Sequence, residues 1–292
     1  MVAISGQHGR VPSAMLQYLA ELWTAPEPPM PLETADLDAG WQPEVLAYLR
    51  RSPYRNALPL SSVTQLRPRC EVVLAHSGGA VQGVAAWYRD GAHPLLALVA
   101  ELDEALALAL AALATRAPAL RAAELSTTLP EQRVRRLAAC AEIVSLAAAY
   151  QMVVEPETLR PAPQEQVRRL RPDDLPAMIE LSARGGPAPL WPGGLSHGPA
   201  FGAFAGEQLV AMAATHFATP DVVEIGAVVL HPAHRHYGLA SACISALAEA
   251  CFGLAPRVYL MLAAGNEAAF AAYRALGFWP AERFALTTFR LG

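Results

Sequence analysis

The chain has 292 residues, of which 53% are hydrophobic and 16% are charged, and its formal net charge is −4. This length and hydrophobic content are enough for two cores of ordinary domain size. No run of five or six like charges occurs, so we expect no nucleic-acid partner. The most apolar stretch, residues 95–113, is interrupted by Glu101, Asp103 and Glu104, so we expect no membrane span and no membrane partner.

The four cysteines are Cys70, Cys140, Cys243 and Cys251, and none of them forms a C-x-x-C pair. Cys243 and Cys251 fall in one predicted helix, too far apart along its axis to form a disulfide. The N-terminus has no basic segment followed by an apolar one, so no signal peptide is expected. These features predict reduced, buried thiols in a cytoplasmic protein.

The first half begins its regular pattern with a predicted hairpin of residues 71–76 and 81–88 around Gly78 and Gly79. The elements expected next are a strand at 95–99, a helix at 103–116, a strand at 122–126 and a helix at 130–139. Three prolines then fall within residues 155–164, which predicts a linker. We place the domain boundary near residue 160, which divides the chain into residues 1–160 and 161–292.

The second half predicts a helix, three strands, a helix, a strand, a helix and a final strand. Their expected ranges are 173–183, 200–205, 208–217, 222–230, 239–252, 257–263, 267–276 and 282–291. This order predicts an α/β (α+β layered) fold with a mixed, mostly antiparallel sheet flanked by helices. The first half repeats part of it, so we expect two similar folds in tandem. Residues 185–199, with Trp191 and His197, form a predicted loop that lines a substrate site or is only an insertion.

The turn Arg235-His236-Tyr237-Gly238-Leu239-Ala240 joins an apolar strand to a helix and contains no acidic residue. Such a turn presents unpaired backbone N–H groups, together with the positive end of the helix, to an anion. Gly238 lets the backbone approach that anion closely. The turn alone therefore predicts an anion-binding loop and does not specify which anion it binds.

Two patterns resemble the GNAT superfamily of acyl-CoA-dependent N-acyltransferases. The first is Arg235-x-x-Gly238-x-Ala240, and the second is Asn266-x-x-Ala269-x-x-x-Tyr273-x-x-x-Gly277-Phe278. The resemblance covers residues 168–291 and is most specific within 224–278. It implies a GNAT fold, acetyl-CoA as co-substrate and no metal. The cofactor-binding residues that it implies are Val228, Val229, Leu230, Arg235, His236, Tyr237, Gly238, Leu239, Ala240, Asn266 and Tyr273.

The resemblance also implies catalytic roles for Glu224 and Tyr273. A glutamate at a similar offset from the loop is the general base in one branch of the superfamily, and a carboxylate flanked by apolar residues has its pKa pushed upward. His216 or a water molecule is the alternative base. Tyr273 would protonate the leaving thiolate, or else it only packs the helix on the sheet, and Asn266 caps that helix.

Several other chemistries are disfavoured. His231, His234 and His236 do not match a zinc-site spacing and have no nearby cysteine or carboxylate. Cys243 has no paired histidine, so a nucleophilic role is not expected. The G-x-G-x-x-G pattern of nucleotide-binding folds is missing.

The first half lacks the loop signature, because Glu101 and Asp103 follow its corresponding strand and would repel a pyrophosphate. We therefore expect a degenerate GNAT-like N-terminal domain, which shapes the acceptor site or a homodimer contact, and one active site per chain. The expected activity is N-acetyl transfer to a primary amine of a small molecule or peptide by direct attack. The alternative is a non-catalytic acyl-CoA sensor or scaffold.

Overall fold

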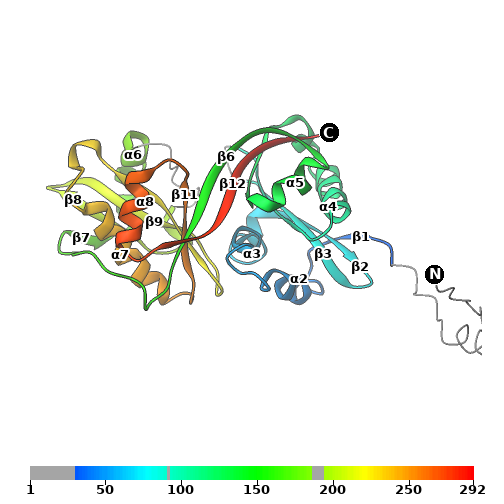
Figure 1. The fold of residues 1–292 in the computed structure, drawn as a ribbon, viewed down its shortest axis with the longest axis horizontal. Coiled ribbons are helices and arrows are strands. Elements are labelled where there is room, and N and C mark those ends of the chain that lie inside the picture. The colour runs from blue at the N-terminus through cyan, green and yellow to red at the C-terminus, as the bar shows by residue number, and fades with distance from the viewer. Residues whose placement is uncertain (1–29, 91–92, 186–193) are drawn as a thin grey trace, which may run out of the picture. The chain divides into compact units, whose positions relative to one another are not determined.

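The computed structural model describes residues 30–90, 93–185 and 194–292. Leu32–Gly292 form one compact unit, and all that follows concerns this unit (Figure 1). None of its helices is both long and apolar enough to cross a membrane, as far as the described residues go.

The strands of the described chain form a single sheet in the order β1-β2-β3-β4-β5-β12-β6-β11-β10-β9-β8-β7. Their bounds are β1 (Glu33–Asp36), β2 (Cys70–Ser77), β3 (Ala80–Tyr88), β4 (Leu95–Ala100), β5 (Leu125–Pro130), β6 (Ala141–Val154), β7 (Val167–Arg169), β8 (Ala200–Ala205), β9 (Gln208–Ala218), β10 (Val223–Leu230), β11 (Val258–Ala263) and β12 (Trp279–Leu291). The pairs β4–β5 and β10–β11 are parallel, and the other pairs recorded among these strands are antiparallel. The predicted mixed, mostly antiparallel sheet is confirmed.

Helices flank the sheet. The α-helices are α2 (Gln42–Leu49), α3 (Ala57–Val63), α4 (Asp103–Arg116), α5 (Val134–Ala138), α6 (Leu175–Gly185), α7 (Leu239–Phe252) and α8 (Glu267–Ala275). The short 3-10 helices are η1 (Arg67–Arg69), η2 (Pro118–Ala122), η3 (Glu131–Arg133), η4 (Pro172–Asp174), η5 (Gly194–His197) and η6 (Pro232–His234). The helices α4 and α7 have the bounds that the sequence predicts.

Two predicted elements of the first half are displaced. The strand expected at residues 122–126 is β5, which begins at Leu125, because Pro118 opens the 3-10 turn η2 directly before it. The helix expected at residues 130–139 is divided into η3 and the short α5. The long strand β6 has no predicted counterpart, and its first part is mostly exposed, so it lacks a clear apolar alternation.

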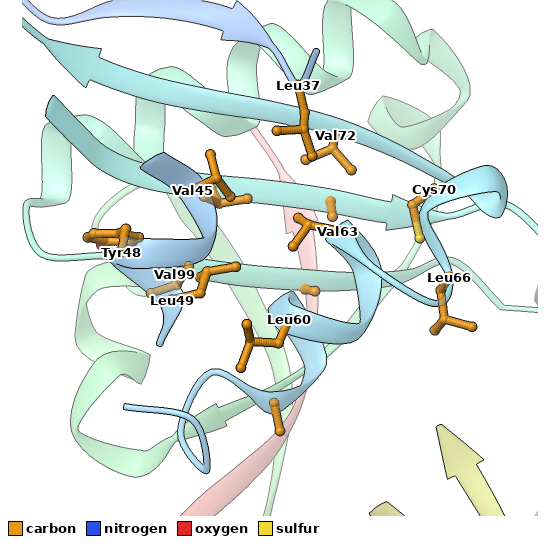
Figure 2. Close-up of a cluster of buried hydrophobic side chains, with 14 of the residues drawn as sticks. Leu37, Val45, Tyr48, Leu49, Leu60, Val63, Leu66, Cys70, Val72 and Val99 are labelled. Carbon is orange, nitrogen blue, oxygen red and sulfur yellow. The ribbon is translucent and has the colours of Figure 1, made fainter. Parts of the chain in front are cut away.

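Each face of the sheet has its own core. On the first half, α4 packs on Val73, Ala85 and Leu96, whereas α2 and α3 cover the opposite face. Figure 2 shows side chains of α2 and α3, including Leu49 and Leu60, gathered over that opposite face. The same cluster continues onto the second half, where it includes Phe217 of β9, Val222 directly before β10, and Tyr259 of β11. Helices α7 and α8 cover the other face of the second half.

The long strands β6 and β12 connect the two halves. They pair antiparallel along most of their lengths and run side by side in Figure 1. The end of β6 also pairs with β11, from Ala149 to Val154, while β12 pairs with β5. The last strand of the chain therefore completes the sheet of the first half, and a strand of the first half completes the sheet of the second.

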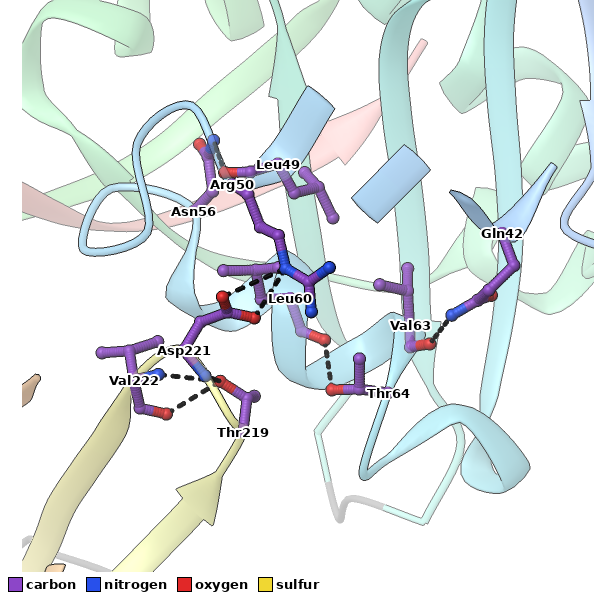
Figure 3. Close-up of polar contacts among 10 residues, drawn as sticks. All are labelled: Gln42, Leu49, Arg50, Asn56, Leu60, Val63, Thr64, Thr219, Asp221 and Val222. Carbon is purple, nitrogen blue, oxygen red and sulfur yellow. Dashed lines mark hydrogen bonds and ion pairs between the residues drawn. The ribbon is translucent and has the colours of Figure 1, made fainter. Parts of the chain in front are cut away.

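Polar contacts fix the α2–α3 segment to the turn before β10. The Nε atom of Arg50 lies 3.0 Å from both carboxylate oxygens of Asp221, and the hydroxyl of Thr219 accepts from the amides of Asp221 and Val222 (Figure 3). The side chain of Gln65 donates to the carbonyl of His197 and accepts from the amide of Ala218. These contacts hold the first half beside the strand on which the candidate site is built.

Candidate functional site

Strand β10 changes course in its middle. It pairs with β9 at Gly226–Ala214 and again at Val229–Met212, so Ala227 and Val228 form a bulge, and Ala227 has a φ of +42°. Its parallel pairing with β11 ends at Ile225–Leu260. Beyond that point the two strands no longer share a ladder. Strands β10 and β11 therefore diverge beyond Ile225, and Val228, Val229 and Leu230 lie in the part of β10 that is no longer paired with β11.

The predicted anion-binding loop follows β10. His236 and Gly238 both have positive φ, at +71° and +73°, and Gly238 is the N-cap of α7. A Cβ at Gly238 would meet no atom of the described chain within 4 Å, so this side of the loop is open. Arg235 and Tyr237 are exposed. The first amides of α7 have no side-chain cap at Gly238. Anion binding by this loop stays a prediction.

A hydrogen-bonded group of three side chains lies at the start of β10. The Nδ1 atom of His216 lies 3.1 Å from Oε1 of Glu224, and the hydroxyl of Tyr259 donates to Oε2. The Nε2 atom of His216 accepts from the amide of Ala227 at 3.1 Å. Because Nε2 needs its lone pair for that bond, the proton of the neutral ring is on Nδ1 and is donated to Glu224.

Tyr259 acts as a hydrogen-bond donor to Glu224. Burial, followed by the neighbouring Glu224 carboxylate, raises the pKa of Tyr259 well above its ordinary value, so its hydroxyl keeps the proton that it donates. The side chain of Glu224 is 13% exposed. A mostly buried carboxylate can accept a proton from a substrate that reaches it.

The local backbone makes room for the imidazole. His216 is the extra residue of β9 between the pairs Glu224–Phe217 and Ile225–Thr215, which is a second irregularity of this strand pair. A Cβ on Gly226 would lie 2.1 Å from two atoms of the His216 ring. Gly226 is therefore required for this ring position. His216 in turn fixes both Glu224 and the bulge at Ala227.

A cavity of about 320 Å³ opens in front of Glu224. Its lining residues are Tyr54, Arg55, Ala57, Leu58, Leu95, Thr128, Gln151, His216, Glu224, Tyr259, Met261, Phe284 and Leu286. Both halves contribute, and most of the side chains are apolar. Sequence reasoning missed Tyr259 and every first-half residue of this lining, because the contacts that join them come from strand pairing between distant segments.

Tyr273 and Asn266 lie away from this cavity. Tyr273 belongs to the core on the α7–α8 face, where its ring packs on Phe278 at 6.0 Å between centroids, whereas Glu224 points to the opposite face of β10. Burial raises the pKa of Tyr273 to about 12. The side chain of Asn266 caps α8 by accepting from the amide of Ala269. The structure thus brings Glu224 and His216 together and sets Tyr273 on the other side of the sheet.

The residues given minor roles are also located. His231 caps η6 through the amide of Ala233, and no group of three possible metal ligands occurs among the described residues. Cys243 is buried, and burial raises the pKa of its thiol to about 12, which opposes thiolate chemistry. His197 is buried beneath the second half's surface. Trp191 lies outside the described residues.

The corresponding part of the first half has no such loop. Only Glu101 and Leu102 separate β4 from α4, and β4 pairs with β3 without a register shift. Asp103 and Glu104 occupy the first turn of α4, and Asp103 accepts from Arg136 at 2.8 Å. This connection gives an anion no open loop.

Comparisons with known proteins give a family match for part of the chain and several similar folds. Residues 166–278 match the model of the acetyltransferase (GNAT) family. One similar solved structure is described as an acetyltransferase of the GNAT family from Novosphingobium aromaticivorans. Its TM-score is 0.61, and its sequence is 20% identical over 82% of this chain and 99% of that chain. A GCN5-related N-acetyltransferase from Kribbella flavida has a TM-score of 0.59 and 21% identity over 81% and 96%.

A third structure is a tandem GNAT protein from the clavulanic acid biosynthesis pathway, with a TM-score of 0.57 and 18% identity over 88% of this chain and 98% of that chain. At these identities the likeness shows a shared fold. It spans both halves, so the N-terminal half also has a GNAT-like fold, as predicted. No curated protein matches the sequence.

Proposed function

On the premise that residues 166–278 are a domain of the acetyltransferase (GNAT) family, we propose that the protein is an acyl-CoA-dependent N-acyltransferase. It transfers an acetyl group from acetyl-CoA to a primary amine by direct attack. The observation that carries the proposal is the arrangement around β10: a bulge, an open loop at a helix N-terminus, and a carboxylate held by His216 and Tyr259.

The co-substrate is assigned to the loop side of β10. The CoA pyrophosphate accepts from backbone amides of Arg235, His236, Tyr237, Gly238, Leu239 and Ala240. The open side of Gly238 and the positive end of α7 support this assignment. The acyl arm then runs along Val228, Val229 and Leu230, where an amide near Val229 polarises the thioester carbonyl. Asn266 and Tyr273 contact the arm near its sulfur.

Glu224 is the proposed general base. It takes a proton from the acceptor ammonium, directly or through water, and the neutral amine attacks the thioester carbon. His216 is less suited to this role, because its Nε2 already accepts from Ala227 and its Nδ1 carries a proton toward Glu224. The group of three therefore has one proton acceptor, Glu224, and two donors.

Tyr273 is the proposed general acid. When the tetrahedral intermediate collapses, the carbon–sulfur bond breaks, and the thiolate takes the proton of the Tyr273 hydroxyl. The extra proton on the attacking nitrogen leaves through water, which restores the tyrosine and gives the neutral amide. A pKa of about 12 keeps this hydroxyl protonated at neutral pH. The position of Tyr273 on the face opposite Glu224 suits a reaction in which amine and thiol approach from the two sides of the sheet.

Each chain is proposed to have one site, with residues 161–292 as the catalytic domain and residues 1–160 as a degenerate GNAT-like domain that shapes the acceptor site. The first-half residues in the cavity lining support this division of roles. The buried free thiols of Cys70, Cys243 and Cys251 suit the reducing cytoplasm.

The proposal is tested by the thermal unfolding midpoint with CoA and with acyl-CoAs of rising chain length. Binding to the native state must raise the midpoint, and no rise with any of them contradicts the proposal. Acetyl transfer is then measured for the wild type, Glu224→Gln and Tyr273→Phe. If CoA binds and neither substitution changes turnover on any amine, a non-catalytic sensor is the better description.

A further inference from the structure

We propose that the acceptor is a small monoamine on an apolar body, an arylalkylamine or alkylamine without a second charge. This inference rests on the proposed function and adds the substrate class. It is carried by the cavity in front of Glu224, whose volume of about 320 Å³ lies at the small end of ligand pockets, which run from about 300 to 1,000 Å³.

The charges of the lining allow one ammonium group. Glu224 is the one carboxylate among the described lining residues. The other charged residue is Arg55, whose Nε lies 2.7 Å from Oε2 of Glu282, and Glu282 also accepts from Gln132. A second ammonium would have no anionic partner in the cavity and would meet the Arg55 guanidinium. An acceptor carboxylate would have to compete with Glu282 for Arg55.

The remaining walls favour an uncharged, apolar body. The rings of Tyr54 and Tyr259 meet edge to face, with centroids 6.3 Å apart, beside the carboxylate. The face of a tyrosine ring attracts a cation, and the ring itself offers apolar surface. Met261, Phe284 and Leu286 line the same cavity from β11 and β12. Burial of an aromatic or aliphatic body here is favourable in proportion to the apolar area removed from water.

The first half determines much of this selectivity. Tyr54 comes from the turn before α3, Leu58 from α3, Leu95 from β4 and Thr128 from β5. Thr128 is the cross-strand partner of Leu286, so one wall of the cavity is a pair formed between the two halves. The half that lacks the anion-binding loop thus supplies the surface that contacts the acceptor body.

The experiment measures kcat/KM of the full chain with acetyl-CoA and two matched pairs of amines. The first pair is 2-phenylethylamine and phenylalanine, which adds a carboxylate; the second is hexylamine and 1,6-diaminohexane, which adds an ammonium. We expect the apolar member of each pair to be preferred at least about tenfold, since burial of an unpaired charge is costly.

A variant pair checks that the cavity is the site of selection. Leu286→Trp fills the cavity and should raise KM for 2-phenylethylamine about tenfold, with a smaller change in kcat. Leu146→Trp, at an exposed position of the neighbouring strand β6 that does not line the cavity, should leave both unchanged. Leu286→Ala should improve the use of bulkier arylalkylamines relative to the wild type.

The outcomes separate this inference from the proposed function. If neither CoA nor acetyl-CoA raises the unfolding midpoint, the proposed function itself fails. If acetyl-CoA binds but phenylalanine or 1,6-diaminohexane is used as well as its apolar partner, only the substrate class is overturned. Acetyl-CoA binding without transfer to either apolar amine overturns it as well, and so does an unchanged KM in Leu286→Trp.

Discussion

The segments β4–α4 and β10–α7 occupy corresponding places in the two halves and differ in three local features. Both strands take part in a short parallel ladder, at Leu95–Leu96 in β4 and at residues 223–225 in β10. The bulge at Ala227, the open loop of residues 231–238 and the carboxylate of Glu224 belong to β10–α7, whereas β4 has a regular register and an acidic helix start. The two halves therefore differ at the proposed binding site by a few residues.

The strand starts make the difference clearest. Leu95 at the start of β4 and Glu224 near the start of β10 line the same cavity. One presents an apolar side chain and the other a carboxylate held by two donors. The first half contributes an apolar wall of the cavity, and the second contributes the carboxylate that is proposed as the base.

The largest expected effect comes from Glu224→Gln. The change removes the proton acceptor and leaves a side chain of similar size, so kcat should fall about 100- to 1,000-fold, within the range that general bases contribute. Steady-state acetyl transfer, with acetyl-CoA affinity measured separately, checks this. Glu101→Gln, at an exposed carboxylate after β4, is the first-half control and should retain wild-type activity. A wild-type kcat in Glu224→Gln would remove Glu224 from the mechanism.

The next effect concerns the glycine beneath the histidine ring. In Gly226→Ala the new Cβ would lie 2.1 Å from His216 ring atoms, so the ring must leave and both of its hydrogen bonds are lost. We expect kcat/KM to fall about 100-fold, or about 2.7 kcal/mol of transition-state stabilisation. In the first half, a Cβ at Gly83 would meet the Cβ of Ala100 at 3.1 Å, a tight contact that involves no residue of the candidate site, so Gly83→Ala should change activity less than about twofold. Equal losses in the two variants would contradict the role of His216.

Cofactor binding gives a smaller contrast. Gly238 and Gly79 both have positive φ, +73° and +82°, and a Cβ at either would meet no described atom within 4 Å. Alanine at either should therefore cost about 1 kcal/mol of unfolding free energy through backbone strain alone. Only Gly238→Ala should weaken CoA binding, by about tenfold, because its methyl group would face the pyrophosphate. Calorimetric titration with CoA measures the affinity of both variants, and denaturant unfolding measures their free energies of unfolding.

The smallest effect is expected for Tyr273→Phe, with a roughly three- to tenfold loss of kcat, below the usual contribution of a general acid because water can replace the proton donor. Since the pKa of Tyr273 is about 12, the acid form is present below that pH and is lost only as the pH rises through it. The wild-type kcat should therefore show no decline from Tyr273 up to about pH 10. The control is Tyr150→Phe, which should keep the wild-type kcat. Tyr150 lies in β6, and its ring packs on Phe270 of α8, the helix that also contains Tyr273. A decline near neutral pH that vanishes in Tyr273→Phe would contradict this assignment.

Local patterns predicted most elements of the fold. Helices α4 and α7 have their predicted bounds, and the strand expected at residues 222–230 is β10, because their signals lie within single segments: apolar periodicity, capping positions and a glycine turn. Helix α8 ends at Ala275, one residue before its predicted end, with Leu276 as C-cap, and Gly277 directly after it has a φ of +93°. Features that depend on pairing between distant strands, above all β6 and its place beside β12, have no comparable local signal.

The candidate site likewise has features with a local sequence signal and features that depend on strand pairing. Glu224 and the loop after β10 could be proposed from residue types and their spacing, and their roles stay predictions. Three other features depend on strand register: the bulge at Ala227, the packing of the His216 ring on Gly226, and the hydrogen bond from Tyr259. A register shift of one residue moves each side chain to the other face of the sheet, and sequence spacing does not determine it.

The pairing of β12 with β5 and β6 has a consequence for biosynthesis. Leu291 pairs with Ala141, and Phe284 pairs with Pro130, so these strand contacts join residues far apart in the chain. The sheet of the first half therefore stays incomplete until the final strand has left the ribosome. Contacts of such long sequence separation slow folding and leave the edge of β5 exposed to other chains in the meantime. A nascent chain halted before β12 should consequently depend on chaperones more than the finished protein does.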